Sequence, residues 1–140
     1  MSLNIFEYVN NLAIEMHIEG DVIFAQGDPS NGRMYFIAEG EVAIIRESDG
    51  VTHELNRLYA GSFFGEMAII NNSARTATVK VTSKKAKLGW LDEEIFLRIG
   101  RANPIFLYSL LKLVITRLGD IEDAIETVFS ERDRENSGGF

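Results

Sequence analysis

Glycines recur through the first half of this chain and confine it to short elements of secondary structure. They stand at Gly20, Gly27, Gly32, Gly40, Gly50, Gly61 and Gly65. The segments between them are rich in β-branched and aromatic residues, and turn signals return about every 8–12 residues, as in antiparallel sandwiches and barrels. We therefore expect strands over residues 21–26, 34–38, 41–46, 53–59, 76–81 and 86–91.

Two of the turns have the composition of hairpin connections. Gly-Asp-Pro at 27–29 and Ser-Asp-Gly at 48–50 combine residues that tolerate positive φ with a proline whose φ is preset. No repeat of about 20–50 residues and no low-complexity linker divides the chain, so we expect a single domain.

The last third of the chain has a helical pattern. The acidic residues 92–94 suit the start of a short helix over 95–99, which we expect Gly100 to end. Asn103 then offers an N-cap oxygen and Pro104 suits a first helical position, which predicts a long helix over 104–129. The charged, glycine-rich residues 131–140 are predicted to form a flexible tail.

The predicted long helix has two apolar faces. A seam with alternating spacings of four and three residues consists of Leu107, Leu111, Val114, Leu118, Ile121, Ile125 and Val128. A second face consists of Phe106, Leu110 and Leu113. Two interpretations are open. In the first, both faces belong to the core of one molecule. In the second, the seam is a dimer interface or a mobile lid. The heptad period favours the dimer or lid.

Composition excludes several classes of protein. The chain of 140 residues is 46% hydrophobic, which suffices for a core, and contains no cysteine for disulfides, thiol nucleophiles or metal ligation. A net charge of −7 argues against a broad surface for nucleic acid or anionic lipid. Neither a membrane span nor a secretion signal is evident, so we expect a cytoplasmic protein without membrane attachment.

Residues 61–81 contain the pattern that most strongly indicates a ligand-binding site. One helical turn over 66–70 would direct the amides near Met67 and Ala68 outward, and free amides at such a place attract an anion. Arg75 offers a planar fork of donors for a phosphate, and Glu66 offers acceptors for a hydroxyl pair such as that of a ribose. Gly65 permits close approach of the backbone to a ligand.

This pattern suits a nucleotide monophosphate, but on the residues alone a structural ion pair between Glu66 and Arg75 is the more common arrangement. Other candidate sites are weaker. His17 and His53 lie on separate predicted strands and predict no metal site. The basic run 84–87 is interpreted as a solvated turn, and Trp90 is expected to pack between the β-domain and the helices.

The segments 64–69 and 75–79 resemble the phosphate-binding cassette of the cyclic nucleotide-binding domain family. Residues 20–24, 26–28 and 35–42 also follow the strand-and-turn pattern of that family, so the resemblance covers about 16–130. Such domains occur in catabolite-activator-type transcription factors, in regulatory portions of cyclic-nucleotide-dependent kinases and in gated channels.

The resemblance implies a mainly β fold with C-terminal helices. Its β-roll, a jelly-roll-like double-stranded β-helix, would span about 16–91, with helices over about 92–130 that end in a long lid or dimer helix. A short N-terminal helix and a further short helix are also implied. The single domain would then cover 1–130.

The resemblance also implies a ligand, a 3′,5′-cyclic nucleotide, and roles for individual residues. Glu66 would bind the ribose 2′-hydroxyl and Gly65 would line the ribose. Arg75 would pair with the cyclic phosphate. The phosphate cradle would be completed by Met67 and the amides of Ala68 and Thr76. The purine would contact Phe64, Val79 and Leu58 from the roll, and Ile121, Glu122 and Ile125 from the lid.

Two positions depart from the family pattern. Ala74 stands where many members have proline, which implies a looser loop. Thr76 stands where many cyclic-AMP binders have a smaller residue, which shifts the preference toward cyclic GMP. Cyclic AMP remains slightly favoured because it is the broader ligand of the family.

The expected function is therefore a non-catalytic cyclic nucleotide sensor, without cofactor or metal, whose C-terminal helices move when the ligand binds. We expect a homodimer through 104–129 and a separate downstream protein partner. Because the chain stops after a polar tail, direct DNA binding is not expected. The alternatives are a dimerisation module with an idle pocket and a cupin-like metalloenzyme.

Overall fold

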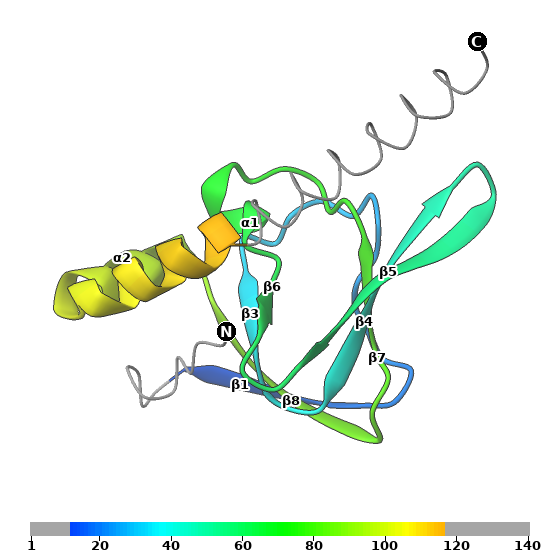
Figure 1. Ribbon diagram of the computed structural model, residues 1–140, viewed down its shortest axis with the longest axis horizontal. Helices are drawn as coiled ribbons and strands as arrows, with labels where there is room; N and C mark the ends of the chain where they lie inside the picture. Colours follow the sequence, from blue (N-terminus) through cyan, green and yellow to red (C-terminus); the bar gives the residue numbers. More distant parts are fainter. Residues whose placement is uncertain (1–11, 117–140) are drawn as a thin grey trace, which may run out of the picture.

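Short strands between the glycine turns assemble into two antiparallel sheets in the computed structural model, which describes residues 12–116 (Figure 1). The first sheet has the order β1 (Ala13–Ile18), β8 (Lys85–Leu91), β3 (Met34–Glu39) and β6 (Phe63–Phe64). The second has the order β2 (Val22–Phe24), β7 (Thr78–Val81), β4 (Glu41–Ser48) and β5 (Val51–Tyr59).

Helices lie within the roll segment of the chain as well as after it, and they pack beside the first sheet. These are α1 (Met67–Ile70), which lies between β6 and β7 in the sequence, α2 (Glu93–Ala102) and a helical segment over 104–116. The arrangement confirms the predicted β-roll with C-terminal helices, and the roll begins at Ala13 rather than at 16. The predicted N-terminal helix lies outside the described residues.

Two apolar clusters hold these parts together. One fills the space between the sheets and includes Tyr35, Ile37, Val42, Phe64, Val79, Val81, Ala86 and Leu88. The other joins the outer face of the first sheet to the helices and includes Leu12, Met34, Phe36, Phe63, Leu91, Ile99, Phe106, Leu110 and Leu113. The second apolar face of the predicted long helix is therefore core, whereas Leu107 and Leu111 of the seam are exposed.

The two predicted hairpin turns differ in outcome. Asp49 and Gly50, with φ of 53° and 75°, form the two-residue connection between β4 and β5, as expected for Asp-Gly. The turn at 27–29 is not a hairpin, because β2 and β3 lie in different sheets. Its backbone instead pairs with Arg75, which accepts from the Gly27 amide at 2.7 Å and donates to the Asp28 carbonyl at 2.9 Å.

The prediction that Gly100 ends its helix is wrong. Asp92 caps α2 by accepting from the Ile95 amide at 2.9 Å, and the helix continues to Ala102. Gly100 is buried inside it, where an added Cβ would lie 2.8 Å from Leu107 Cδ1. The glycine thus permits close approach of two helices rather than termination.

Two side-chain placements also differ from expectation. Trp90 packs against the cluster between the sheets, with the Arg33 guanidinium 3.7 Å above its ring, and not between the roll and the helices. Lys85 and Lys87 belong to β8 rather than to a solvated turn.

Within residues 12–116, no helix is long and apolar enough to cross a membrane.

A buried arginine in a pocket beside α1

A cavity of about 270 Å³ opens where α1 and the loop before β7 meet the roll. Most residues proposed from the sequence line it, namely Leu58, Phe64, Gly65, Glu66, Met67, Arg75, Thr76 and Val79. Ala68 is buried outside the lining, and its amide donates to the Gly65 carbonyl at 3.1 Å. Ile121, Glu122 and Ile125 lie outside the described residues.

Arg75 is the one buried polar or charged side chain of residues 12–116, with 6% of its surface exposed. Its Nη2 donates to Asn31 Oδ1 at 2.6 Å and to the Arg33 carbonyl at 2.8 Å, and its Nη1 donates to the Gly65 carbonyl at 3.2 Å. The guanidinium also stacks on Phe24, 4.0 Å from the ring centroid. Three separate places in the chain, Phe24, the turn at 31–33 and Gly65, therefore fix its position.

All three hydrogen-bond acceptors of Arg75 are neutral. The guanidinium makes no ion pair with any carboxylate of residues 12–116, so the structural Glu66–Arg75 pair, the common arrangement of these residue types, is not formed. Burial lowers the pKa of Arg75, while Tyr35 and Glu66 act in the opposite direction. A sheltered cation with only neutral acceptors is electrostatically complementary to an anionic ligand.

Gly65 is required by the close contact between its backbone and Arg75. Its φ of 78° lies in the left-handed region, and a Cβ added there would meet Arg75 Nη1 at 3.0 Å. A side chain at this position would therefore displace the guanidinium that the Gly65 carbonyl holds.

Glu66 lies at the junction of two cavities. It is half-buried and immediately precedes α1, of which Met67 is the first residue. Besides the Arg75 pocket, Glu66 lines an apolar cavity of about 450 Å³ between α1, α2 and the segment 104–116. Glu66 thus borders both the roll and the helices.

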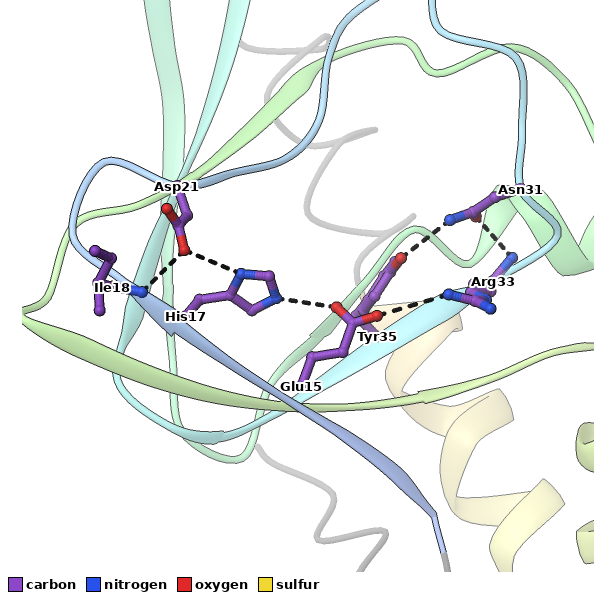
Figure 2. Close-up of polar contacts among 7 residues, drawn as sticks. All are labelled: Glu15, His17, Ile18, Asp21, Asn31, Arg33 and Tyr35. Carbon is purple, nitrogen blue, oxygen red and sulfur yellow. Dashed lines mark hydrogen bonds and ion pairs between the residues drawn. The ribbon is translucent and has the colours of Figure 1, made fainter.

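Sequence reasoning missed the residues that hold Arg75 in place. Asn31 also accepts from the Arg33 amide at 3.1 Å and donates to the Tyr35 hydroxyl at 3.1 Å (Figure 2). No motif marks Asn31 or Phe24, because only the folded topology brings them to Arg75. Other lining residues that were not predicted are Ile44, Asn56, Ser73, Ala74 and Ala77.

The two histidines lie apart on β1 and β5, as the sequence predicts. No group of three or more histidine, aspartate or glutamate side chains suited to a metal ion occurs in the described part of the chain.

Comparisons with known proteins identify the family to which the chain is similar. A family model described as "Cyclic nucleotide-binding domain" matches residues 18–103. The chain is 30% identical over 121 residues to a cAMP-dependent protein kinase type II regulatory subunit of Drosophila melanogaster, covering 86% of this chain and 30% of that protein. It is 36% identical over 78 residues to a cGMP-dependent protein kinase of Eimeria tenella, covering 56% and 7%.

Among solved structures, the catabolite activator protein of Thermus thermophilus superposes with a TM-score of 0.77 at 26% identity, over 88% of this chain and 56% of that one. The chain spans less than a third of the length of either curated relative. Since the family model matches more than half of its residues, the chain belongs to the cyclic nucleotide-binding domain family.

Proposed function

We propose that this chain is a non-catalytic sensor that binds a 3′,5′-cyclic purine nucleotide in the Arg75 pocket. The observation that carries the proposal is the buried guanidinium, held by three neutral acceptors at the wall of a cavity and lacking a described counter-carboxylate. A cyclic phosphate supplies one negative charge and oxygen acceptors for such a group. The names of the related kinases support the same class of ligand.

The lining residues have complementary roles in this proposal. Glu66 accepts from the ribose 2′-hydroxyl, and Gly65 allows the sugar to approach the backbone. Met67 and the backbone amide of Thr76 complete the phosphate site. The purine lies against the apolar side chains of Leu58, Phe64 and Val79, to which the structure adds Phe24 and Ile44. The Ala68 amide, already bonded to Gly65, would join the cradle only after a change at the start of α1.

Titration with cyclic AMP tests the proposal, followed by calorimetry or by the emission of Trp90. Arg75→Ala is expected to weaken binding about 30-fold or more, because removing one partner of a sheltered charge pair costs about 2–5 kcal/mol. Arg46→Ala is the matched control: Arg46 is exposed on β4 and outside the pocket, so its removal changes net charge equally. Equal affinity of the two variants would contradict the placement of the phosphate.

The preferred base is decided by competition between the two cyclic nucleotides. We propose cyclic AMP as the main ligand, although Thr76 is exposed at the rim and offers a hydroxyl to guanine. Thr76→Ala is expected to leave cyclic AMP affinity nearly unchanged and to weaken cyclic GMP. A parallel loss for both ligands would assign the Thr76 hydroxyl to the phosphate instead.

We also propose that ligand binding moves the helices. Glu66 and α1 border both the ligand pocket and the apolar cavity lined by Ile69, Phe96 and Leu110, so a ligand that draws in Glu66 shifts α1 against α2. A ligand changes this equilibrium only by its difference in affinity for the two arrangements. Hydrogen exchange at α1 and α2 should slow on binding. Saturated binding without altered exchange there would disprove the coupling and leave the binding site intact.

A further inference from the structure

In an ordinary surface strand the apolar side chains face the interior and the polar ones face solvent. In β1 this arrangement is reversed. Residues that are paired across a sheet share a face. Glu15 pairs with Leu88 and His17 pairs with Ala86, both of which are buried, so Glu15 and His17 face the interior of the roll. The apolar alternate positions face outward: Ile14, Met16 and Ile18 are 41%, 64% and 63% exposed.

The inward polar residues form a connected network that fixes this orientation (Figure 2). His17 Nε2 lies 2.9 Å from Glu15 Oε2, and His17 Nδ1 lies 3.3 Å from Asp21 Oδ2. Asp21 also accepts from the Ile18 amide at 3.0 Å, and Glu15 lies 3.6 Å from Arg33. A shift of one residue would break these contacts, so the outward apolar row is specified by the fold.

Lysines stand beside this apolar row on the same face. Lys87 pairs with Met16 and Lys85 with Ile18, and both lysines are exposed. Neither makes an ion pair with another residue of 12–116, although Glu39 is paired with Lys87 across the sheet. The segment 84–87 holds three of the five lysines in a chain of net charge −7, so this cationic strip is a local exception.

The dimensions of the two rows indicate the kind of element that covers them. Ile14 to Ile18 span roughly 13 Å at about 3.3 Å per residue, and the lysines lie one strand away, about 5 Å to the side. A strand added beside β1, which is at the edge of the described sheet, would extend that sheet and leave both rows uncovered. An α-helix, about 10 Å wide, contacts both rows over two to three turns.

We propose that the outward face of β1 and β8 is a docking surface for an amphipathic, acidic helix of a partner protein. The apolar stripe of that helix packs on Ile14, Met16 and Ile18, and carboxylates along its flank meet Lys85 and Lys87. Burial of the apolar row supplies affinity, and the charge complementarity sets orientation and excludes basic partners. This surface is separate from the Arg75 pocket, which none of these five residues lines.

Two-dimensional amide NMR of the full chain tests the proposal. The probes are an acetylated 16-residue helical peptide with a leucine stripe flanked by glutamates and its counterpart with every glutamate replaced by lysine. The acidic peptide should shift the amides of 13–18 and 85–89 saturably. Equal shifts with both peptides, shifts confined to α1 and α2, or no shifts would overturn the proposal.

Variants separate the apolar from the electrostatic contribution. Lys85→Glu with Lys87→Glu should weaken the acidic peptide about tenfold and create binding of the basic one. Lys80→Glu with Lys112→Glu changes net charge equally and should leave both unchanged, since these exposed lysines lie elsewhere. Met16→Ser should weaken the acidic peptide without altering the thermal midpoint, because Met16 is exposed.

Two other occupants have distinct signatures. If the same amides shift when the protein alone is concentrated, a second copy occupies the face. If they broaden with vesicles containing phosphatidylserine but not with the acidic peptide, the face binds anionic lipid. Either result overturns the assignment to an acidic helix.

Discussion

Arg75 depends on Asn31 more than on any other side chain for its hydrogen bonding. The Asn31 oxygen accepts from the guanidinium at 2.6 Å, while its amide group donates to the Tyr35 hydroxyl. A hydrogen bond to a charged group contributes about 1.5–3 kcal/mol, but Arg75 keeps its two carbonyl acceptors in Asn31→Ala. We therefore expect cyclic nucleotide binding to weaken by a smaller amount, about 2- to 10-fold. Calorimetric titration measures the change.

Ser30→Ala is the control for this variant, because the Ser30 hydroxyl stabilises the same turn through the Gly32 amide and does not touch Arg75. Similar losses in both variants would mean that the turn, and not the Asn31 oxygen, positions the arginine.

Comparing alanine variants of Gly65 and Gly50 distinguishes the effect of backbone strain from the effect of contact with the site. Their φ values are 78° and 75°, but a Cβ at Gly65 meets Arg75 whereas a Cβ at Gly50 meets nothing within 4 Å. Substitution of either by alanine should lower the free energy of unfolding by about 1 kcal/mol or more. Only Gly65→Ala should also reduce ligand affinity. Urea unfolding and titration measure the two effects, and a loss of affinity in Gly50→Ala would refute a direct contact.

At the scale of elements, α2 contacts the next helix at Gly100. This contact predicts that the effect of Gly100→Ala on the free energy of unfolding changes sign when Leu107 is replaced. Gly100→Ala favours helix by about 1 kcal/mol in isolation, but its Cβ would lie 2.8 Å from Leu107 Cδ1. We expect Gly100→Ala to destabilise the wild-type chain and to stabilise a Leu107→Ala background. Urea unfolding of the four proteins in this double-mutant cycle measures the coupling. Additive effects would show that Leu107 moves aside freely.

The elements were predictable where local chemistry decides them. Asp49-Gly50 determines its hairpin, and Asp92 determines the start of α2. The prediction that Gly100 ends its helix was wrong because a glycine inside a helix has the same local sequence signature as one that ends it. Only tertiary packing distinguishes the two. Trp90 was misplaced for a related reason, since its cation partner Arg33 comes from another strand connection.

The candidate site also has one part that was predictable from the sequence and one part that was not. The segment 64–79 identifies the residues whose functional groups line the pocket, because they are local in sequence. Apart from the Gly65 carbonyl, the groups that hold Arg75 come from residues 24–33. They could not be inferred, because their role depends on how β2 and β3 meet α1 in space. The roles assigned to the lining residues stay predictions until a ligand is bound.

At the scale of the whole molecule, the exposed seam predicts self-association. Leu107 and Leu111 are 38% and 56% exposed, although they follow the heptad pattern that continues in the sequence to Val128. We propose a homodimer through 104–129, and Leu111→Glu should shift it toward monomer. Sedimentation equilibrium with and without cyclic AMP measures this change. A wild-type monomer at tens of micromolar in both states would contradict the dimer.

Two of the three oxygens that hold Arg75 belong to peptide groups, at Gly65 and Arg33. Amino-acid replacement alters side chains but leaves every main-chain carbonyl in place. Relatives whose loops have diverged can therefore retain the orientation of this arginine as long as the path of the backbone is kept. Inheritance of the anion site follows the course of the chain more closely than it follows the identity of the neighbouring residues.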